Sequence, residues 1–276
     1  MGADTTIEWT THTWNPWQGC AKVSPGCDHC YMFSDKRRYG QDPETVVRSK
    51  PPTFSAPLKI REPGMVFTCS WSDWFIRDAD DWRAEAWDII RRTPHLTYQI
   101  LTKRPSRMKH CLPPDWGAGY SNVWLGVSVE SQEHGRRVTT LLETPAHKRF
   151  VSAEPLLGPL SLGCIPWSAS NRGYVNALTG VTEFPEVAAT PHGAPPIRPL
   201  DWVIVGGESG DHSRPFDVAW ARSLVKQCQK SGVAVFVKQL GARPFEAGAP
   251  VQIRTRKGGD LEDLPEDLRV REFPRG

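Results

Sequence analysis

The chain has 276 residues, of which 39% are hydrophobic and 24% are charged, and this composition is typical of an ordinary globular protein. The formal net charge of +3, from 34 basic and 31 acidic residues, is too small to indicate nucleic-acid binding by itself. No stretch approaches the roughly 20 apolar residues that a membrane span needs, so we expect no membrane partner.

The cysteines indicate a reducing compartment. Four of the seven are scattered singly, which does not resemble the disulfide framework of a secreted protein: Cys69, Cys111, Cys164 and Cys228. The first ten residues are polar and acidic and contain no apolar signal-peptide region. We therefore expect a cytoplasmic protein, in which clustered cysteines usually serve metal or redox chemistry.

Short β-rich runs alternate with amphipathic stretches along nearly the whole chain. The predicted strands are near Trp9–Trp14 and at Met65–Thr68, Thr97–Leu101, Val123–Ser128, Arg149–Ala153, Trp202–Gly206 and Val233–Lys238. The predicted helices are Asp28–Tyr39, Asp80–Arg92, Ser131–Leu142 and Val218–Ser231. This alternation predicts an α/β fold with a parallel sheet covered by helices, namely a partial or complete TIM-like (β/α) barrel. Core packing is expected for most of the 12 Trp.

We expect residues 1–276 to form a single barrel domain with two appendages. The segment Pro166–Leu200 is rich in Gly, Pro, Ala and Thr and has no helical period, which indicates a loop insertion at the surface. Deleting it is expected to leave the barrel intact. The polar tail from Ala242 to Gly276 is expected to pack across the barrel rather than to form a domain.

Almost every predicted strand is followed by a polar or charged side chain. These residues are Ser70, Asp73, Thr102, Lys103, Ser128, Glu130, Glu154, Glu208, Lys238 and Gln239. In a β/α barrel the carboxyl ends of the strands form the active site, so the pattern favours a shared site there. The alternative is that these residues are ordinary helix caps and polar loop residues.

The chemistry-bearing motif is a cysteine cluster with the spacing C-x6-C-x2-C at Cys20, Cys27 and Cys30. Three thiolates on a Gly/Pro loop before a helix can converge on one centre, where backbone amides favour the anionic sulfurs. A structural zinc site and a closed iron–sulfur cluster each need four ligands, whereas a three-cysteine 4Fe–4S cluster leaves one iron open. That open iron can chelate the amino and carboxylate groups of S-adenosylmethionine. The alternative is a zinc knuckle completed by His12, His29 or Cys69.

Several motifs resemble one family along nearly the whole chain, the Pro166–Leu200 segment excepted. They are Thr13–Cys20 (TWNPWQGC), Ser24–Cys27 (SPGC), Cys30–Tyr31, Gly126–Glu130 (GVSVE), Ser152–Pro159 (SAEPLLGP), Val205–Gly210 (VGGESG), Lys238–Gly241 (KQLG) and Pro265–Glu272 (PEDLRVRE). The chain thus resembles a phage-associated family of radical-SAM-like proteins, catalogued mostly as a domain of unknown function.

That resemblance implies a radical SAM barrel carrying a 4Fe–4S cluster on the three cysteines, with S-adenosylmethionine as cofactor and an external electron donor. It also implies a possible three-Cys-motif partner protein, which is often encoded beside such proteins. One departure stands out, because the commonest radical SAM signature is C-x3-C-x2-C, and this loop has three additional residues between its first two cysteines.

If the barrel is right, the strand ends place the cofactor. His29, before the third cysteine, is expected near the adenine, where an imidazole can stack or donate a hydrogen bond. Ser128 or Glu130 is expected to bind the ribose hydroxyls, because a carboxylate accepts two hydrogen bonds from a diol. Lys103 or Arg104 is expected to meet the methionine carboxylate. For each residue the alternative role is a helix cap or a salt bridge that holds the loops.

The substrate is the least defined part of this hypothesis. Glu154 and Glu208 are expected to face it, and Gly206-Gly207 allows close approach of the backbone to a ligand. Remote similarity to DNA-repair radical enzymes suggests a nucleic-acid base. Basic residues that can line a phosphate path are Lys36, Arg37, Arg38, Lys103, Arg104 and Arg107. The rival hypotheses are a zinc-stabilised nucleic-acid-binding module without catalysis and a structural phage component.

Overall fold

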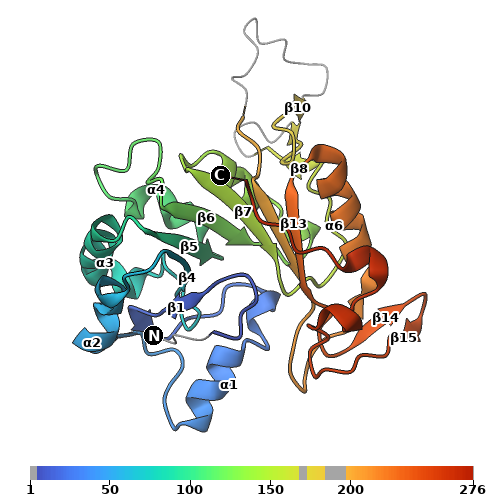
Figure 1. Cartoon of the computed structure of the whole chain (residues 1–276), viewed down its shortest axis with the longest axis horizontal. Helices are drawn as coiled ribbons and strands as arrows, with labels where there is room; N and C mark the ends of the chain where they lie inside the picture. Colours follow the sequence, from blue (N-terminus) through green and yellow to red (C-terminus); the bar gives the residue numbers. More distant parts are fainter. Residues whose placement is uncertain (1–4, 168–172, 184–196, 276) are drawn as a thin grey trace, which may run out of the picture. The chain divides into compact units, whose positions relative to one another are not determined.

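The computed structural model describes residues 5–167, 173–183 and 197–275 (Figure 1). The chain divides into two compact units, the first made of residues 1–127 and 144–148, and the second of residues 128–143 and 149–276. None of the helices in the described ranges combines the length and the apolar character that crossing a membrane requires.

The described residues of the first unit form four parallel strands and four α-helices. The strands are β1 (His12–Trp14), β4 (Gly64–Thr68), β5 (Leu96–Thr102) and β6 (Val123–Ser128), and they pair in that order. The helices are α1 (Tyr31–Arg38), α2 (Pro51–Phe54), α3 (Asp80–Arg92) and α4 (Met108–Cys111). A separate two-stranded antiparallel sheet joins β2 (Trp17–Gln18) to β3 (Val47–Arg48).

The parallel strands of this unit are buried, as their continuous apolar runs predict. Val66 at the centre of β4 pairs with His12 on one side and with Tyr98 on the other, and both Val66 and Tyr98 are fully buried. A strand that is covered on both faces buries the side chains on each face. Its sequence is therefore continuously apolar instead of alternating between polar and apolar residues. The long helix α3 begins with Asp80 and ends with Arg92, charges that suit its dipole.

Tryptophans form the core of the first unit. Trp74 lies at the centre of a group of rings, with centroid distances of 5.8 Å to Trp14, 5.1 Å to Trp17 and 5.1 Å to Trp87. Trp14, Trp17 and Trp74 are fully buried and Trp87 is 2% exposed. The expectation that most tryptophans serve the core is therefore confirmed for this group.

Within the part of the second unit that the structure describes, there are three parallel strands and two α-helices. The strands β7 (Lys148–Ala153), β11 (Trp202–Gly206) and β13 (Ala234–Gln239) pair in that order. The helices are α5 (Arg136–Leu142) and α6 (Val218–Ser231). Short strands form two small sheets: β8 (Ile165–Pro166), β9 (Tyr174–Val175) and β10 (Thr182–Glu183), and then β12 (Phe216–Asp217), β14 (Pro244–Glu246) and β15 (Ala249–Pro250).

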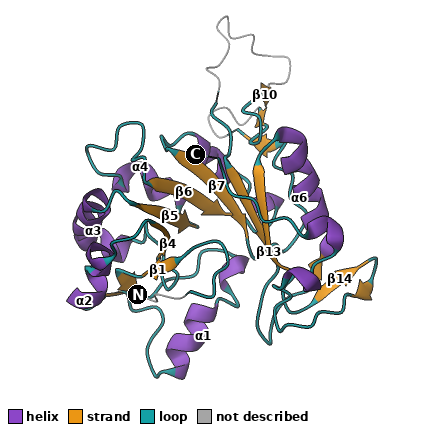
Figure 2. Ribbon diagram, in the orientation of Figure 1, coloured by secondary structure: helices purple, strands orange, loops and turns teal. Residues whose placement is uncertain are grey.

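Helix α6 shows how the sequence sets the bounds of an element. The Asp217 carboxylate accepts a hydrogen bond from the backbone N–H of Ala219 (2.9 Å), and Gly232 ends the helix in the left-handed conformation (φ 68°). The helix packs on β11 and β13, alongside β13 in Figure 2. The predicted range Val218–Ser231 is therefore confirmed to the residue.

The described residues of the predicted insertion include two short strands. The residues of Pro166–Leu200 that the structure describes, 166–167, 173–183 and 197–200, contribute the end of β8 together with β9 and β10, and Val175 pairs with Ile165 of β8. Val175 and Ala177 are fully buried, so these residues belong to the packed interior of the second unit. Residues 168–172 and 184–196 lie outside the described residues. Deletion of the whole segment is therefore expected to expose apolar surface, which the sequence did not indicate.

Part of the tail that begins at Ala242 packs on β13. The backbone N–H of Val237 donates to the carbonyl of Val270 (2.8 Å), and Phe236 forms an antiparallel bridge with Arg271. Leu264 and Leu268 are buried. The tail therefore covers the outer strand of the second unit and leaves that edge paired.

The predicted α/β class is confirmed. Seven strands run parallel, four in the first unit and three in the second, and helices follow most of them. This is the arrangement expected of a part of a β/α barrel. The third predicted helix, Ser131–Leu142, is divided into a 3₁₀ turn at Gln132–His134 and helix α5.

Gly207 is required by the packing of two strand ends. A Cβ atom at this position would lie 2.1 Å from the carbonyl oxygen of Leu240, and the N–H of Gly207 donates to Gln239 (3.0 Å). The carboxyl ends of β11 and β13 therefore touch through their backbones. The expected role of Gly206-Gly207 in approaching a ligand is corrected at Gly207, because a backbone carbonyl of the protein occupies that space.

We predict that Gly207→Ala lowers the free energy of unfolding by about 1–3 kcal/mol, because the added methyl group displaces packed backbone. Gly158→Ala is the control, since a Cβ atom there would meet only Ser131 at an ordinary 3.6 Å. Urea denaturation of both variants measures the difference. Equal midpoints for the two variants would contradict the packing role of Gly207.

Candidate metal-binding site

The three clustered cysteines lie on one loop of the first unit. Cys20 follows β2, Cys27 ends a 3₁₀ turn (Pro25–Cys27), and Cys30 is the N-cap residue of α1. Cys20 and Cys27 therefore lie in the loop before α1, and Cys30 lies at the start of that helix. All seven cysteines of the chain lie within the described residues, and all seven are free thiols.

Gly19 fixes the position of this loop. Its N–H donates to the carbonyl of Trp71 (3.0 Å), and its own carbonyl accepts from the Ser72 hydroxyl (2.6 Å). The residue has φ +99°, and a Cβ atom would lie 2.3 Å from the carbonyl oxygen of Thr45. Only glycine readily adopts this positive φ and has no Cβ atom to collide with Thr45, which explains why glycine precedes Cys20.

The thiols of Cys20, Cys27 and Cys30 influence one another. Burial raises the pKa of Cys20 to about 12, and the charges of Asp73 and Cys27 act in the same direction. Burial also raises the pKa of Cys30, and the charge of Cys27 adds to this effect. Cys27 therefore lies near both other thiols. Metal binding at this loop must release protons, because Cys20 and Cys30 are protonated at neutral pH without it.

Two cations lower the pKa values of the loop thiols and so favour their thiolate forms. The guanidinium of Arg104 lies 3.6 Å from the sulfur of Cys20, and it lowers the pKa of that thiol against the effect of burial. The charge of Lys103 acts in the same way on Cys30. The expected partner of Lys103 or Arg104 was a cofactor carboxylate. Arg104 instead contacts the cysteine loop itself.

Arg104 and Asp73 tie the cysteine loop to the ends of β4 and β5. One Nη of Arg104 donates to the carbonyl of Ala21 (2.7 Å), and the other lies 3.2 Å from the Asp73 carboxylate. Asp73 also accepts from the Thr102 hydroxyl (2.7 Å) and from the N–H of Lys103 (3.0 Å). The buried Asp73 carboxylate therefore accepts several hydrogen bonds, and the nearly buried Arg104 guanidinium connects it to the cysteine loop.

The structure also places a fourth thiol near the loop. Cys69 is buried, and burial raises its pKa, with the charges of Asp73 and Cys20 adding to the rise. His12 lies against Gly64 at the amino end of β1, whereas the cysteine loop follows the carboxyl end of that strand. His29 is exposed, between Cys27 and Cys30. Among the three proposed zinc-completing residues, Cys69 therefore has the most direct electrostatic link to Cys20.

The three loop thiols are the candidate ligands of a metal. Among residues 5–167, 173–183 and 197–275, no set of three or more His, Cys, Asp or Glu side chains is already arranged to hold a metal ion. The donor set nevertheless fits a thiophilic metal, because three neighbouring thiols share one loop flanked by Lys103 and Arg104.

The predicted carboxylates of the second unit each have a cation at hydrogen-bonding distance. Glu130, which is fully buried, accepts from Arg137 (2.8 Å) and lies 3.4 Å from Nδ1 of His134. The carbonyl of Ser128 accepts from the same guanidinium (2.8 Å). Arg137 therefore donates hydrogen bonds to both residues that were expected to bind ribose. Arg137 was not among the predicted site residues.

Glu208 and Glu154 follow the same pattern. Glu208 accepts from the backbone N–H (2.9 Å), Nε (3.0 Å) and Nη2 (2.6 Å) of Arg214. Glu154 accepts from Lys238 (2.6 Å), so the predicted strand-end residues of β7 and β13 contact each other. These ion pairs agree with the alternative role given above for the strand-end residues, in which each carboxylate forms a salt bridge that holds the loops. They also leave an ordered set of charges at the carboxyl ends of the strands, where a β/α fold places ligands.

We predict that Lys238→Gln lowers the free energy of unfolding by about 1–2 kcal/mol, because it leaves the largely buried Glu154 without its cation. The double variant Glu154→Gln, Lys238→Gln is expected to recover part of this loss. Arg254→Gln is the control, since Arg254 and Glu262 form an exposed ion pair that contributes little. Urea denaturation measures all three. An equal loss for Lys238→Gln and Arg254→Gln would show that burial of the Glu154 pair is unimportant.

The basic residues predicted to line a phosphate path do not act together. Lys36 is buried, Arg104 contacts Asp73 and Cys20, and Arg107 binds Asp80 (2.6 Å). Arg37 and Arg38, at the end of α1, are exposed. The set as a whole is therefore not a continuous exposed path.

The fold and the cysteine loop together define an α/β protein of parallel strands, with a candidate metal-binding loop after its first strand. Residues 4–265 match the family model described as "Protein of unknown function (DUF5131)", and the chain belongs to that family. No curated protein and no solved structure matches the chain. The family description assigns no activity, so the resemblance to radical SAM proteins stays a prediction.

Proposed function

We propose that the protein is a radical SAM enzyme with a 4Fe–4S cluster on Cys20, Cys27 and Cys30, acting in the reducing cytoplasm. The observation that carries the proposal is the grouping of three free, electrostatically coupled thiols on one loop after β1. When bound and reduced by an external electron donor, the cluster supplies one electron, which cleaves S-adenosylmethionine to methionine and a 5′-deoxyadenosyl radical.

The protein's own residues hold and balance this site. Three thiolates bring three negative charges to the loop, and Lys103 and Arg104 counter part of that charge. Asp73 fixes Arg104 at 3.2 Å, so the guanidinium is in place before a metal binds. Lys103 remains the candidate for the methionine carboxylate, because Arg104 is engaged with the loop.

The other cofactor roles are proposed residue by residue. His29 is exposed beside the cysteines, which suits contact with an adenine. Ser128 and Glu130 keep their proposed role toward the ribose hydroxyls, with Arg137 orienting the Glu130 carboxylate. Glu154 and Glu208 remain the candidates that face the substrate, each oriented by a basic side chain. A nucleic-acid base is the substrate class proposed, and a three-Cys-motif protein is the partner.

The test is release of 5′-deoxyadenosine. Anaerobically reconstituted protein, incubated with dithionite and S-adenosylmethionine, is expected to form this product slowly even without substrate. The Cys30→Ala variant, treated identically, is expected to form none above a protein-free blank. Product formation at the same rate by wild type and variant would count against the proposal.

A second candidate function is a zinc-stabilised nucleic-acid-binding module without catalysis. The observation that favours it is Cys69, a buried thiol whose pKa is raised by burial and by the charges of Asp73 and Cys20, and which is the candidate for the fourth ligand of a zinc site. This candidate predicts one zinc per chain, no visible absorbance and no 5′-deoxyadenosine. Loss of zinc in Cys69→Ala, with the three loop cysteines intact, would support it.

A further inference from the structure

The exposed apolar side chains of the described residues are concentrated around the cysteine loop. Four of the eight large ones lie between residues 23 and 47, namely Val23, Tyr31, Tyr39 and Val47. The metal site described above uses none of these four side chains. Apolar groups gathered on one part of a surface mark a place where a ligand or a partner binds.

Tyr31 is a fixed aromatic ring at the start of α1. Its hydroxyl donates to the carbonyl of Ser70 (2.7 Å), two residues after the end of β4. Tyr31 nevertheless remains 49% exposed. A ring that is held in place but not covered loses little conformational freedom when a flat ligand stacks on it. Because Tyr31 directly follows Cys30, such a ligand would lie beside the proposed cluster.

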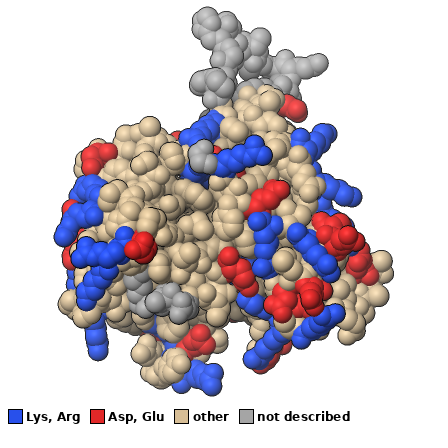
Figure 3. All heavy atoms as spheres, in the orientation of Figure 1, with Lys and Arg blue, Asp and Glu red and all other residues tan. Residues whose placement is uncertain are grey.

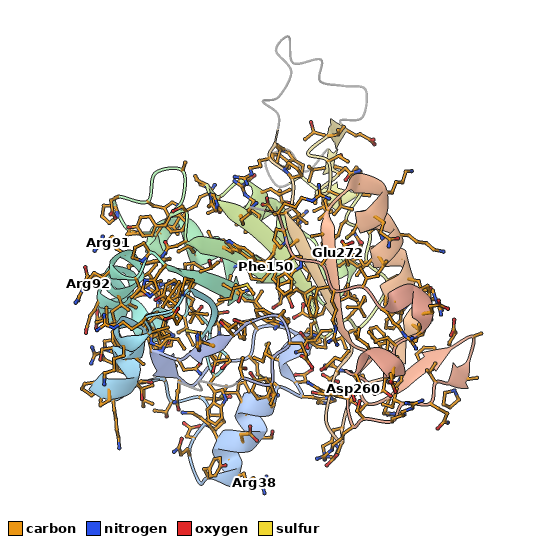
Figure 4. The ribbon with its side chains drawn as sticks, viewed as in Figure 1. Arg38, Arg91, Arg92, Phe150, Asp260 and Glu272 are labelled. Carbon is orange, nitrogen blue, oxygen red and sulfur yellow. The ribbon has the colours of Figure 1, made fainter. Side chains whose placement is uncertain are left out.

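The other end of α1 carries a second aromatic ring and two cations. Tyr39, the C-cap residue of the helix, is 70% exposed. Arg37 and Arg38 precede it and are exposed, and within the described ranges neither guanidinium has a carboxylate partner. Figure 3 shows Lys and Arg spheres at this end of the helix, and Figure 4 shows Arg38 extending from it.

Lys22 adds a cation from the cysteine loop. Its ammonium lies 5.6 Å from the centroid of the Phe33 ring, and the guanidinium of Arg37 lies 6.0 Å from the same centroid. Helix α1 itself has one carboxylate, Asp35, against three basic residues in its last turn. A basic last turn also suits the helix dipole, but the dipole gives no reason for an exposed aromatic ring beside it.

The helix spaces these groups along one side of the loop. Tyr31 and Arg38 lie on the same face of α1, because seven residues span about two turns. Tyr39 lies about 12 Å from Tyr31 along the helix axis, since each residue rises about 1.5 Å. Proteins bind single-stranded nucleic acids with this combination, in which bases stack on aromatic rings and cations contact the phosphates. A duplex hides the faces of its bases, so the two rings favour an unpaired strand.

We propose that the α1 surface, made of Tyr31, Arg37, Arg38 and Tyr39, binds a single-stranded nucleic acid. Bases stack on the two tyrosines, and phosphates contact the two arginines. This inference rests on the proposed function and deepens it, because it names the form of nucleic acid that would bring a base to the cysteine loop. Strand binding needs neither iron nor turnover, so it can fail while 5′-deoxyadenosine is still released, and the reverse also holds.

The test is fluorescence anisotropy of the full chain, before and after anaerobic reconstitution. The probe is a labelled single-stranded oligodeoxynucleotide of about 12 nucleotides, and RNA of the same sequence and the corresponding DNA duplex are titrated in parallel. Tyr39→Ala removes the exposed ring, and Tyr39→Phe keeps it. Tyr174→Ala is the matched control, since Tyr174 is a 47% exposed tyrosine of the second unit.

We expect wild type to bind the single strand more tightly than the duplex, and Tyr39→Ala to weaken binding about fivefold or more. Tyr39→Phe and Tyr174→Ala are expected to keep the affinity of wild type. Tighter binding of RNA than of DNA would identify RNA as the strand. Absence of binding, which would leave the surface to a protein partner, would overturn the proposal. Equal affinity for the duplex, or equal weakening by Tyr39→Ala and Tyr174→Ala, would also overturn it.

The double variant Arg37→Gln, Arg38→Gln tests the phosphate contacts. Each contact with a phosphate of a single strand contributes about 0.7 to the slope of log affinity against log salt concentration, so the slope is expected to fall by about 1.4. Arg92→Gln is the control, because Arg92 is an exposed arginine at the end of α3 (Figure 4). A purely structural role of Arg37 and Arg38 would leave the slope unchanged, and that result would overturn the proposed contacts.

Discussion

Replacing any one of Cys20, Cys27 and Cys30 with Ala is expected to abolish stable iron binding. A single cuboidal cluster contains about four irons, and two thiolates do not hold it firmly, so the iron content of each variant should fall to near zero. Anaerobic reconstitution followed by iron and sulfide analysis measures the loss.

Cys164→Ala is the matched control for these variants. Cys164 is an exposed free thiol of the second unit, so its removal changes the cysteine count without disturbing the loop. It is expected to keep the iron content of wild type. Cys111→Ala and Cys228→Ala should also keep it, since these residues lie on α4 and α6. Full iron binding by Cys27→Ala would contradict the assignment of the ligands.

Arg104→Gln is expected to lower the free energy of unfolding by about 3 kcal/mol, because it leaves the buried Asp73 carboxylate without its cation. It also removes the hydrogen bond to Ala21 and the contact with the Cys20 sulfur. The loop should then be less ordered before metal binding, and less iron should be bound at limiting iron concentration. Urea denaturation and iron titration measure the two effects.

The double variant Asp73→Asn, Arg104→Gln separates charge from packing. Neutralising Asp73 removes the uncompensated buried charge, so the double variant is expected to be more stable than Arg104→Gln alone. Arg104→Lys keeps the charge but lacks the second donor arm, and its stability should lie between wild type and Arg104→Gln. Additive losses in the double variant would show that Arg104 and Asp73 do not act as a pair.

The local patterns of the sequence predicted the framework well. Helices α3 and α6 and strands β6 and β11 were predicted to the residue, because each is a strongly periodic or continuously apolar run. The two-residue strands β9 and β10 were missed, since so short a segment contains no period to detect. Their pairing depends on contacts that only the folded chain supplies.

The candidate site was predicted less completely than the fold. The spacing of the cysteines identified the loop, because all three residues are close together in the chain. The contact of Arg104 with Cys20 joins residues 84 positions apart, and no local pattern encodes it. Arg137 follows Glu130 by seven residues on the next helix, so a search for cations one helix after each strand-end carboxylate would have found it.

The identity of the metal tests the central proposal most directly. Protein purified without oxygen and analysed for iron, acid-labile sulfide and zinc is expected to contain iron and sulfide in equal amounts, about four of each per chain after reconstitution, with a brown colour. Stoichiometric zinc, bound by Cys20, Cys27 and Cys30 with a fourth protein ligand such as Cys69, would contradict the radical mechanism and establish the zinc-stabilised module in its place.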